Sequence, residues 1–223
     1  MKNARLGIVI ALTLLPWPLV WLGMYQLHSI PWTFFLYHGI CLLPAVIIFR
    51  TLWLPGLRRP TKMQFVSLVA SAVALGAACI MAYHLTGELV IEKQTVLEVL
   101  TQRGYEAKWM LPLCVYFIVV NATLEELFWR GVILNELKFV DKTWKIFGIV
   151  WTNVAFAAWH YLVIRLLVRP VWAELVILSL VLVGLYSSWL YRKYDSILLP
   201  ILWHAFVFDL AVIVVFVNFA IQR

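Results

Sequence analysis

Seven long hydrophobic runs constrain this chain more than any other feature. Charged or turn-forming residues bound these runs, which cover about 6–26, 30–54, 64–85, 109–134, 146–168, 171–191 and 197–220. A transmembrane helix needs about 20 mainly apolar residues, and lipid does not tolerate unpaired backbone groups. We therefore expect an all-α, polytopic membrane protein with about seven transmembrane helices in a single domain, 1–223. The composition agrees, since 64% of the residues are hydrophobic and only 13% are charged.

The segment 86–109 has a different pattern from the runs that flank it. It mixes apolar positions such as Leu89 and Val96 with charged positions such as Glu92, Glu98 and Arg103. This mixture is typical of an amphipathic helix that lies in the membrane interface. We expect one such helix in addition to the transmembrane helices.

The distribution of Lys and Arg favours one orientation in the membrane. With the N-terminus in the cytoplasm, eleven of these residues fall in cytoplasmic loops and six on the other side, with Arg130 left out because it lies inside a run. Cytoplasmic loops are enriched in basic residues, so we expect a cytoplasmic N-terminus and an external C-terminus. The chain has a net charge of +7, and its basic residues are scattered at helix ends. This distribution fits contact with anionic lipid headgroups and argues against a nucleic-acid partner.

Three charged residues lie in the fourth run, where a buried charge is costly. Glu126 and Arg130 are four residues apart, so they share a helix face and can form an ion pair. Glu125 points about 100° away from Glu126 and is left free by that pair, while Asn121, one turn earlier, shares the face of Glu125. A salt-bridge cluster that only fixes helix packing is the alternative interpretation.

Two histidines lie in other runs, His160 in the fifth and His204 in the seventh. Asn153 is about 20° from His160 around the helix, so we expect both to face one cavity. Asp209 is about 140° from His204 around the helix, so it can join a site with His204 only if the helix is locally distorted. Otherwise we expect Asp209 to pair with a neighbouring helix. Two histidines and a free glutamate on three helices indicate a site. The remaining histidines lie near the outer ends of runs, and we expect them to be interfacial: His28, His38 and His84.

These residue types suggest amide hydrolysis without a Ser or Cys nucleophile. A glutamate can take a proton from water as a general base, while a histidine orients that water or protonates the leaving amine. A second histidine, helped by an amide, can donate to the developing oxyanion. This interpretation requires no cofactor. Zinc bound by His160, His204 and Glu125 is the alternative, because two histidines and a carboxylate form a known catalytic ligand set, although the chain contains no HExxH motif.

Three motifs within residues 110–212 resemble the CPBP family, the CAAX-prenyl endopeptidase and bacteriocin-processing intramembrane proteases also called Abi. "EELFWR" (125–130) matches the family signature EExxxR, and "FAAWH" (156–160) matches FxxxH. "YRKYDSILLPILWHA" (191–205) resembles the last conserved stretch, which ends in a histidine. The motifs occur in the family's order along the chain.

The resemblance implies a helical intramembrane endopeptidase whose catalytic cavity opens towards the cytoplasm. It assigns water activation to Glu125 and His160 and the oxyanion site to His204. The family has an asparagine four residues after the last histidine, but this chain has Phe208 there. Asn153 could replace that amide, or Asp209 could do so through a helix irregularity; otherwise the activity is weak or absent.

The expected depths of the two histidines differ. If the fifth helix begins at Lys145, His160 lies about 22 Å from the cytoplasmic end, whereas His204 lies only about 11 Å from it. The two can meet only if the fifth helix begins outside the bilayer or the helices tilt strongly.

We therefore expect a peptidase that acts on a peptide or protein substrate at the lipid bilayer. A compact chain without a soluble domain suits the inner membrane of a prokaryote. A catalytically silent membrane binding protein, such as an immunity factor or regulatory scaffold, is the main alternative, supported by the missing asparagine. A proton-coupled carrier is less favoured, because carriers commonly show repeated halves and this sequence shows none.

Overall fold

Helices account for all the regular secondary structure that the computed structural model describes, in residues 2–138 and 144–221. This confirms the all-α prediction. The elements of the first half are α1 (Lys2–Leu14), α2 (Pro16–Trp21), η1 (Leu22–Gln26), α3 (Ile30–Phe34), η2 (Phe35–Leu42), α4 (Leu43–Ile48), α5 (Arg50–Trp53), η3 (Leu54–Gly56), α6 (Lys62–Val90) and α7 (Lys93–Gln102). Those of the second half are η4 (Ala107–Trp109), α8 (Met110–Tyr116), η5 (Phe117–Asn121), α9 (Ala122–Glu126), η6 (Leu127–Ile133), α10 (Leu134–Lys138), α11 (Trp144–Leu167), α12 (Pro170–Tyr194), α13 (Leu198–Trp203), η7 (His204–Asp209) and α14 (Leu210–Ile221).

Six helices in the described residues are long and apolar enough to cross a membrane. They follow the first six predicted runs: Arg5–Gln26, Ile30–Ile48, Lys62–Gly87, Ala107–Leu137, Ile146–Leu167 and Pro170–Tyr194. The seventh run is a shorter apolar helix over Leu198–Val214, which continues in α14. The chain is thus a polytopic membrane protein. The second predicted span was too long, because the backbone leaves helical geometry at Phe49 (φ −95°, ψ 23°) before the short α5 begins.

The predicted interfacial helix is shorter than expected. The helix α6 continues to Val90 and ends where Ile91 becomes extended, so the segment contains α7 as its separate α-helix and the short η4 at its end. Its apolar residues Val96 and Leu100 are buried and pack against Leu113 and other residues of neighbouring segments. The helix α7 therefore has one face covered by protein, as its amphipathic pattern requires.

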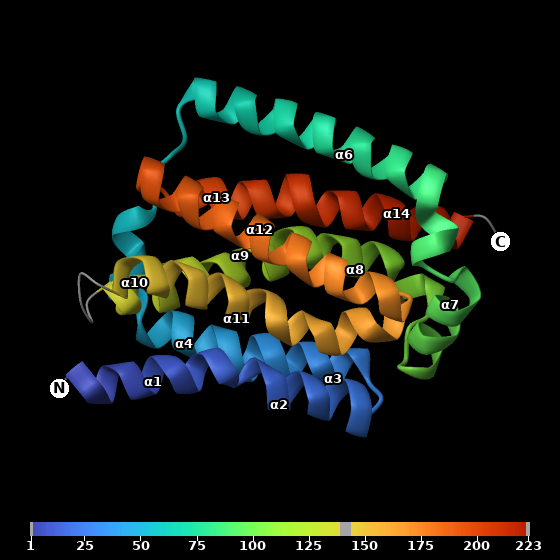
Figure 1. Cartoon of the computed structure of the whole chain (residues 1–223), viewed down its shortest axis with the longest axis horizontal. Coiled ribbons are helices and arrows are strands. Elements are labelled where there is room, and N and C mark those ends of the chain that lie inside the picture. The colour runs from blue at the N-terminus through green and yellow to red at the C-terminus, as the bar shows by residue number, and fades with distance from the viewer. Residues whose placement is uncertain (1, 139–143, 222–223) are drawn as a thin grey trace.

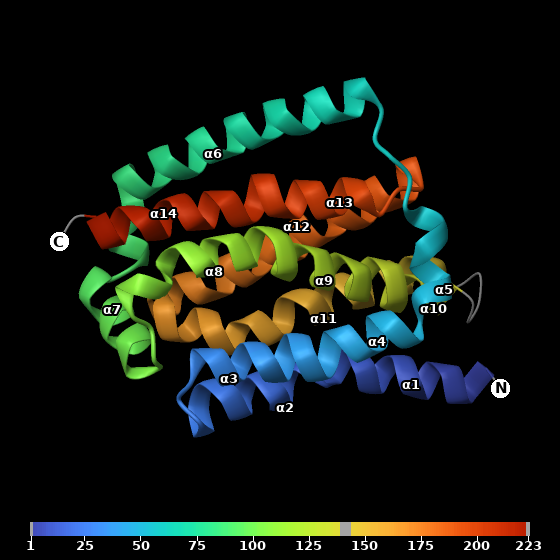
Figure 2. The same ribbon diagram turned by 180° about the vertical axis from the view of Figure 1, so that it is seen from behind.

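The helices form a bundle in which α6 is the most peripheral element (Figure 1). It lies beside α13 and α14 on one side, whereas α1 and α2 lie on the opposite side. Only 6% of the apolar stretch of α6 is buried inside the protein, compared with 44% of the apolar stretch of Ile30–Ile48. The two termini lie at opposite ends of the bundle in both views (Figures 1 and 2), as expected for an odd number of crossings. Which end faces the cytoplasm stays a prediction.

Several spans contain π-helical segments, in which backbone bonds join residues five apart. The segments η2, η5, η6 and η7 lie inside the second, fourth and seventh spans. At the end of η7, for example, the N–H of Leu210 donates to the carbonyl of Ala205. These segments carry most of the buried polar side chains described below, and π turns often occur at functional sites.

Candidate active site

The predicted ion pair on the fourth span is present and fully buried. Arg130 Nη1 lies 3.1 Å from Glu126 Oε1, and both side chains have at most 1% of their surface exposed. The other terminal nitrogen, Arg130 Nη2, donates to Asn153 Oδ1 and to the carbonyl of Gly184, each at 3.0 Å. A buried charge needs such partners, because each missing hydrogen bond leaves part of its desolvation cost uncompensated.

Asn153 belongs to this guanidinium cage. Its Nδ2 donates to the carbonyl of Ile149 at 2.7 Å and to Ser188 Oγ at 3.0 Å, and its Oδ1 accepts from Arg130. The expectation that Asn153 faces one cavity with His160 is therefore wrong, because its amide is directed to Arg130 and α12. Gly184 permits this close approach, since a Cβ there would lie 2.6 Å from Asn153 Oδ1.

Glu125 is separate from the Arg130 pair, as predicted, but it is not free. Its Oε1 accepts a hydrogen bond of 2.9 Å from the hydroxyl of Tyr37. Its Oε2 lies 3.7 Å from Nε2 of His204, beyond direct hydrogen-bond distance. Glu125 therefore has one oxygen anchored by a neutral donor and the other facing an imidazole.

His204 lies at the centre of the carboxyl cluster. Its Nδ1 is 2.9 Å from Glu126 Oε1, and its Nε2 is 3.4 Å from Asp209 Oδ1. In a regular α-helix Asp209 would point away from His204, but both residues lie in the π-helical segment η7, where residues five apart lie one turn apart. The helix irregularity considered from the sequence is thus present, and it brings Asp209 onto the His204 ring.

No hydrogen bond or ion pair joins His160 to this cluster in the part of the chain that the structure describes. The ring centroid of Phe156 lies 5.0 Å from that of His160 and 6.3 Å from that of His204. His160 Nδ1 is 2.7 Å from the carbonyl of Phe156, and the ring stacks on Trp159 at 3.8 Å. Because a carbonyl only accepts, Nδ1 carries the proton and Nε2 is left as an acceptor. Phe156, one turn before His160, is the residue of α11 whose ring lies beside His204.

The comparison with known protein families gives one match. Residues 107–208 match the family Rce1-like, described as Type II CAAX prenyl endopeptidase Rce1-like. This match confirms the resemblance to the CPBP/CAAX proteases, and at the family level it supports a CAAX-type intramembrane protease. No curated protein and no solved structure matches the chain.

The Rce1-like region includes Glu125, Glu126, Arg130, His160 and His204 and ends one residue before Asp209. The cluster also extends beyond that region. Asn121 Nδ2 donates to Asp209 Oδ2 at 3.4 Å, and Asn121 Oδ1 lies 3.0 Å from Nε2 of His38, on η2. The expectation that His38 is interfacial is therefore wrong, because its ring is buried between the second and fourth spans.

Sequence reasoning missed Tyr37, His38, Gly184 and Ser188. His38 carried a usable signal, since it lies eight residues inside an apolar run, where a polar side chain indicates function by default. Tyr37 and Ser188 carried no such signal, because tyrosines and serines are common in membrane helices for other reasons.

The zinc alternative has no assembled ligand set in the part of the chain that the structure describes. Over residues 2–138 and 144–221, no group of three His, Cys, Asp or Glu side chains is arranged to hold a metal ion. The Phe156 ring contacts the rings of two of the three proposed ligands, His160 and His204. The mechanism below therefore uses only side chains of the protein, and metal dependence stays a prediction. The three cysteines are free thiols: Cys41, Cys79 and Cys114.

Proposed function

We propose that this protein is an intramembrane endopeptidase that hydrolyses a peptide bond of a membrane-associated peptide or protein. The observation that carries the proposal is the arrangement of Glu125, a buried carboxyl that Arg130 does not neutralise and that faces His204 Nε2 at 3.7 Å. Burying a carboxyl group in a membrane helix is costly and is usually tolerated only for function. The Rce1-like match provides independent support at the family level.

In this mechanism Glu125 acts as the general base. Water attacks the carbonyl carbon of the substrate, a C–O bond forms, and the released proton passes to Glu125. The carbonyl oxygen becomes an oxyanion, which accepts a hydrogen bond from Nε2–H of His204. The C–N bond then breaks, and the leaving amine takes the proton held by Glu125. The products are a carboxylic acid and an amine, so atoms and charges balance.

The carboxyl groups around His204 support its role as a donor. Glu126 Oε1 and Asp209 Oδ1 lie near different nitrogens of the ring. Ionised carboxylates only accept hydrogen bonds, so this environment favours a ring with a proton on both nitrogens. His160 differs, because its Nε2 is an acceptor and its side chain is partly exposed. We assign it to orienting water or to relaying a proton beside the carboxyl cluster.

The test is cleavage of an internally quenched, farnesylated CAAX peptide by purified protein in proteoliposomes. Glu125→Gln removes the base and retains the shape, and it should lower kcat by about 100-fold or more. Glu174→Gln is the matched control, since Glu174 is an exposed carboxylate on α12, and it should stay within about twofold of the wild type. Equal cleavage by Glu125→Gln and Glu174→Gln would contradict the proposal.

A catalytically silent membrane binding protein is the competing function. One observation favours it: Phe208 replaces the expected asparagine. The same experiment distinguishes the two functions. A silent protein would leave the peptide intact in every variant, and Glu125→Gln would not alter any binding phenotype.

A further inference from the structure

Two adjacent residues of η2, Tyr37 and His38, contact the candidate site from outside the Rce1-like region. Their side chains are almost completely buried, at 2% and 4% exposure. Tyr37 contacts Glu125, and His38 contacts Asn121, one turn earlier on the same face of the fourth span. The second span therefore meets the site at two successive positions.

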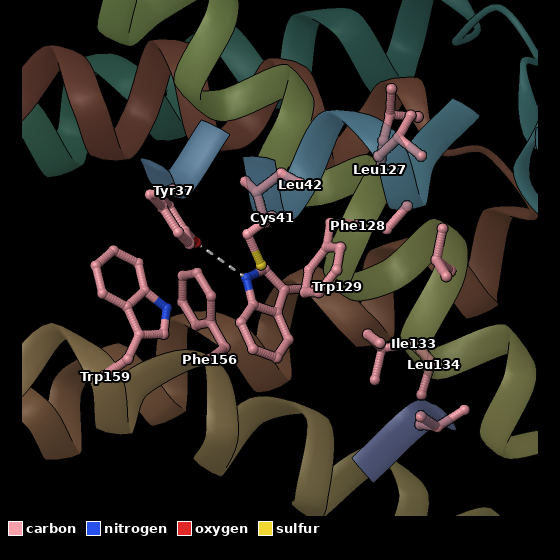
Figure 3. Close-up of a cluster of buried hydrophobic side chains, with 14 of the residues drawn as sticks. Tyr37, Cys41, Leu42, Leu127, Phe128, Trp129, Ile133, Leu134, Phe156 and Trp159 are labelled. Atoms are coloured by element: carbon pink, nitrogen blue, oxygen red, sulfur yellow. Dashed lines mark hydrogen bonds between the residues drawn. The ribbon is translucent and has the colours of Figure 1, made fainter. Parts of the chain in front are cut away.

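Of the two polar groups hydrogen-bonded to the Tyr37 hydroxyl, only Glu125 can accept its proton. Trp129 Nε1, which is always a donor, lies 3.5 Å from the Tyr37 oxygen (Figure 3). The tyrosine proton is thus directed to Glu125 Oε1, at 2.9 Å. Tyr37 is itself held in place, because its ring packs against that of Trp159 at 4.3 Å (Figure 3). This anchor fixes one oxygen of Glu125 and leaves the other facing His204.

His38 acts on His204 through two intermediate side chains. Asn121 uses Nδ2 to donate to Asp209, so its Oδ1 faces His38 as an acceptor. His38 must then donate from Nε2, which leaves Nδ1 to accept the hydroxyl proton of Tyr116 at 2.7 Å. Asp209 in turn lies 3.4 Å from Nε2 of His204. Donation runs from Tyr116 through His38 and Asn121 to Asp209, and Asp209 also accepts from Nε2 of His204.

We propose that Tyr37 and His38 are positioning residues of the peptidase site. Tyr37 orients the carboxyl of Glu125, and His38 orients the ring of His204 through Asn121 and Asp209. This inference rests on the proposed function. Neither residue is placed to touch the substrate in this arrangement, so their loss should lower kcat and leave KM nearly unchanged. A displacement of about 1 Å in a catalytic group can reduce the rate about 100-fold.

The test uses the full chain in proteoliposomes with the same quenched, farnesylated CAAX peptide. Tyr37→Phe removes only the hydroxyl that contacts Glu125, and we expect kcat to fall about 10- to 100-fold. Tyr25→Phe is the matched control, because the Tyr25 hydroxyl donates to a backbone carbonyl, that of Leu162, elsewhere in the bundle. It should retain the kcat of the wild type.

His38 is tested by loss and by rescue. His38→Leu should lower kcat, and His38→Gln should restore part of it, because a glutamine amide can donate to Asn121. Should His38→Leu fail to fold, Tyr116→Phe tests the same chain by removing one hydrogen bond, with an expected loss of about 2- to 10-fold.

A second readout does not depend on turnover. In protein labelled with ¹⁵N-histidine, the His204 ring signals should shift in His38→Leu and remain in place in Tyr25→Phe. If the wild type is active and the Tyr37 and His38 variants keep its kcat and its His204 signals, the inference is overturned and the proposed function stands. If the wild type and Glu125→Gln are equally inactive, the proposed function fails, and the inference fails with it.

Discussion

Gly184 is the most sensitive position in the guanidinium cage around Arg130. A methyl group at this position would lie 2.6 Å from Asn153 Oδ1 and 3.0 Å from Arg130 Nη2. Carbon atoms in favourable contact lie about 3.5–4.0 Å apart, so Gly184→Ala forces the amide and the guanidinium to separate. The methyl cannot move away, because it would be attached to the backbone in the interior of α12.

The expected cost follows from the hydrogen bonds that this separation disturbs. Arg130 Nη2 donates to Asn153 Oδ1 and to the Gly184 carbonyl, and hydrogen bonds to charged groups contribute about 1.5–3 kcal/mol each. Losing one or both destabilises the fold by about 2–5 kcal/mol. Alanine is favoured over glycine in a helix interior by about 1 kcal/mol, which offsets a small part of this cost.

Gly76→Ala is the matched control for this substitution. Gly76 also lies inside a helix, α6, but a Cβ there would have nothing within 4 Å. The change in helix propensity is the same for both variants, so the difference between them isolates the clash. We expect Gly184→Ala to melt at least about 4 °C below Gly76→Ala, because 1 kcal/mol shifts Tm by about 2–4 °C at this chain length.

The assay is thermal unfolding of both purified variants in one mild detergent, followed by far-UV circular dichroism. Cleavage by Gly184→Ala should fall as well, since Glu126 shares Arg130 with this cage and also contacts His204. Equal melting temperatures for the two variants would refute the reasoning, because α12 would then have room for a methyl group beside Arg130.

Three further results are expected. Ser188→Ala should lower the free energy of unfolding by about 1–2 kcal/mol, because Ser188 Oγ lies 3.0 Å from the buried amide nitrogen of Asn153. The control Ser179→Ala, at an exposed serine, should change the free energy of unfolding by less than about 0.5 kcal/mol. Chemical denaturation measures both values. Arg130→Lys should reduce both stability and kcat, since one ammonium nitrogen cannot reproduce the fork that reaches Glu126, Asn153 and Gly184 together. Treatment with 1,10-phenanthroline should leave peptide cleavage unchanged, and a loss that zinc restores would contradict a mechanism without metal.

The features that the sequence predicted correctly depend on one helix at a time. Hydrophobicity and length located the spans, because a bilayer imposes both on any helix that crosses it. The four-residue spacing predicted the Glu126–Arg130 pair, because helical geometry alone places those side chains together. Neither prediction required knowledge of a neighbouring span.

The features that were missed depend on contacts between spans. Asn153 and His160 lie at similar angles around α11, but seven residues separate them by about 10 Å along the axis. Asn153 therefore meets Arg130 of the fourth span, whereas His160, further along α11, does not. His38 was misjudged for the same reason, since nothing in the sequence of the second span reveals that Asn121 lies opposite.

The contact between His204 and Asp209 depends on the winding of η7, and this can be tested by deletion. A π-helical turn accommodates one extra residue without changing the register of the helix on either side. Deleting Phe206, an exposed residue of η7, would let the segment return to α-helical winding. Asp209 would then follow His204 by four residues, the spacing at which α-helical side chains share a face.

We therefore expect the chain without Phe206 to fold, to melt within a few degrees of the wild type and to retain cleavage. Deleting Leu182, an exposed residue in the regular helix α12, is the control. There the deletion rotates all later residues of the helix by about 100°, which moves Gly184 and Ser188 away from Arg130 and Asn153. If both deletions unfold the protein equally, η7 does not contain a removable extra residue. The position of Asp209 must then be set by the packing of the seventh helix against its neighbours.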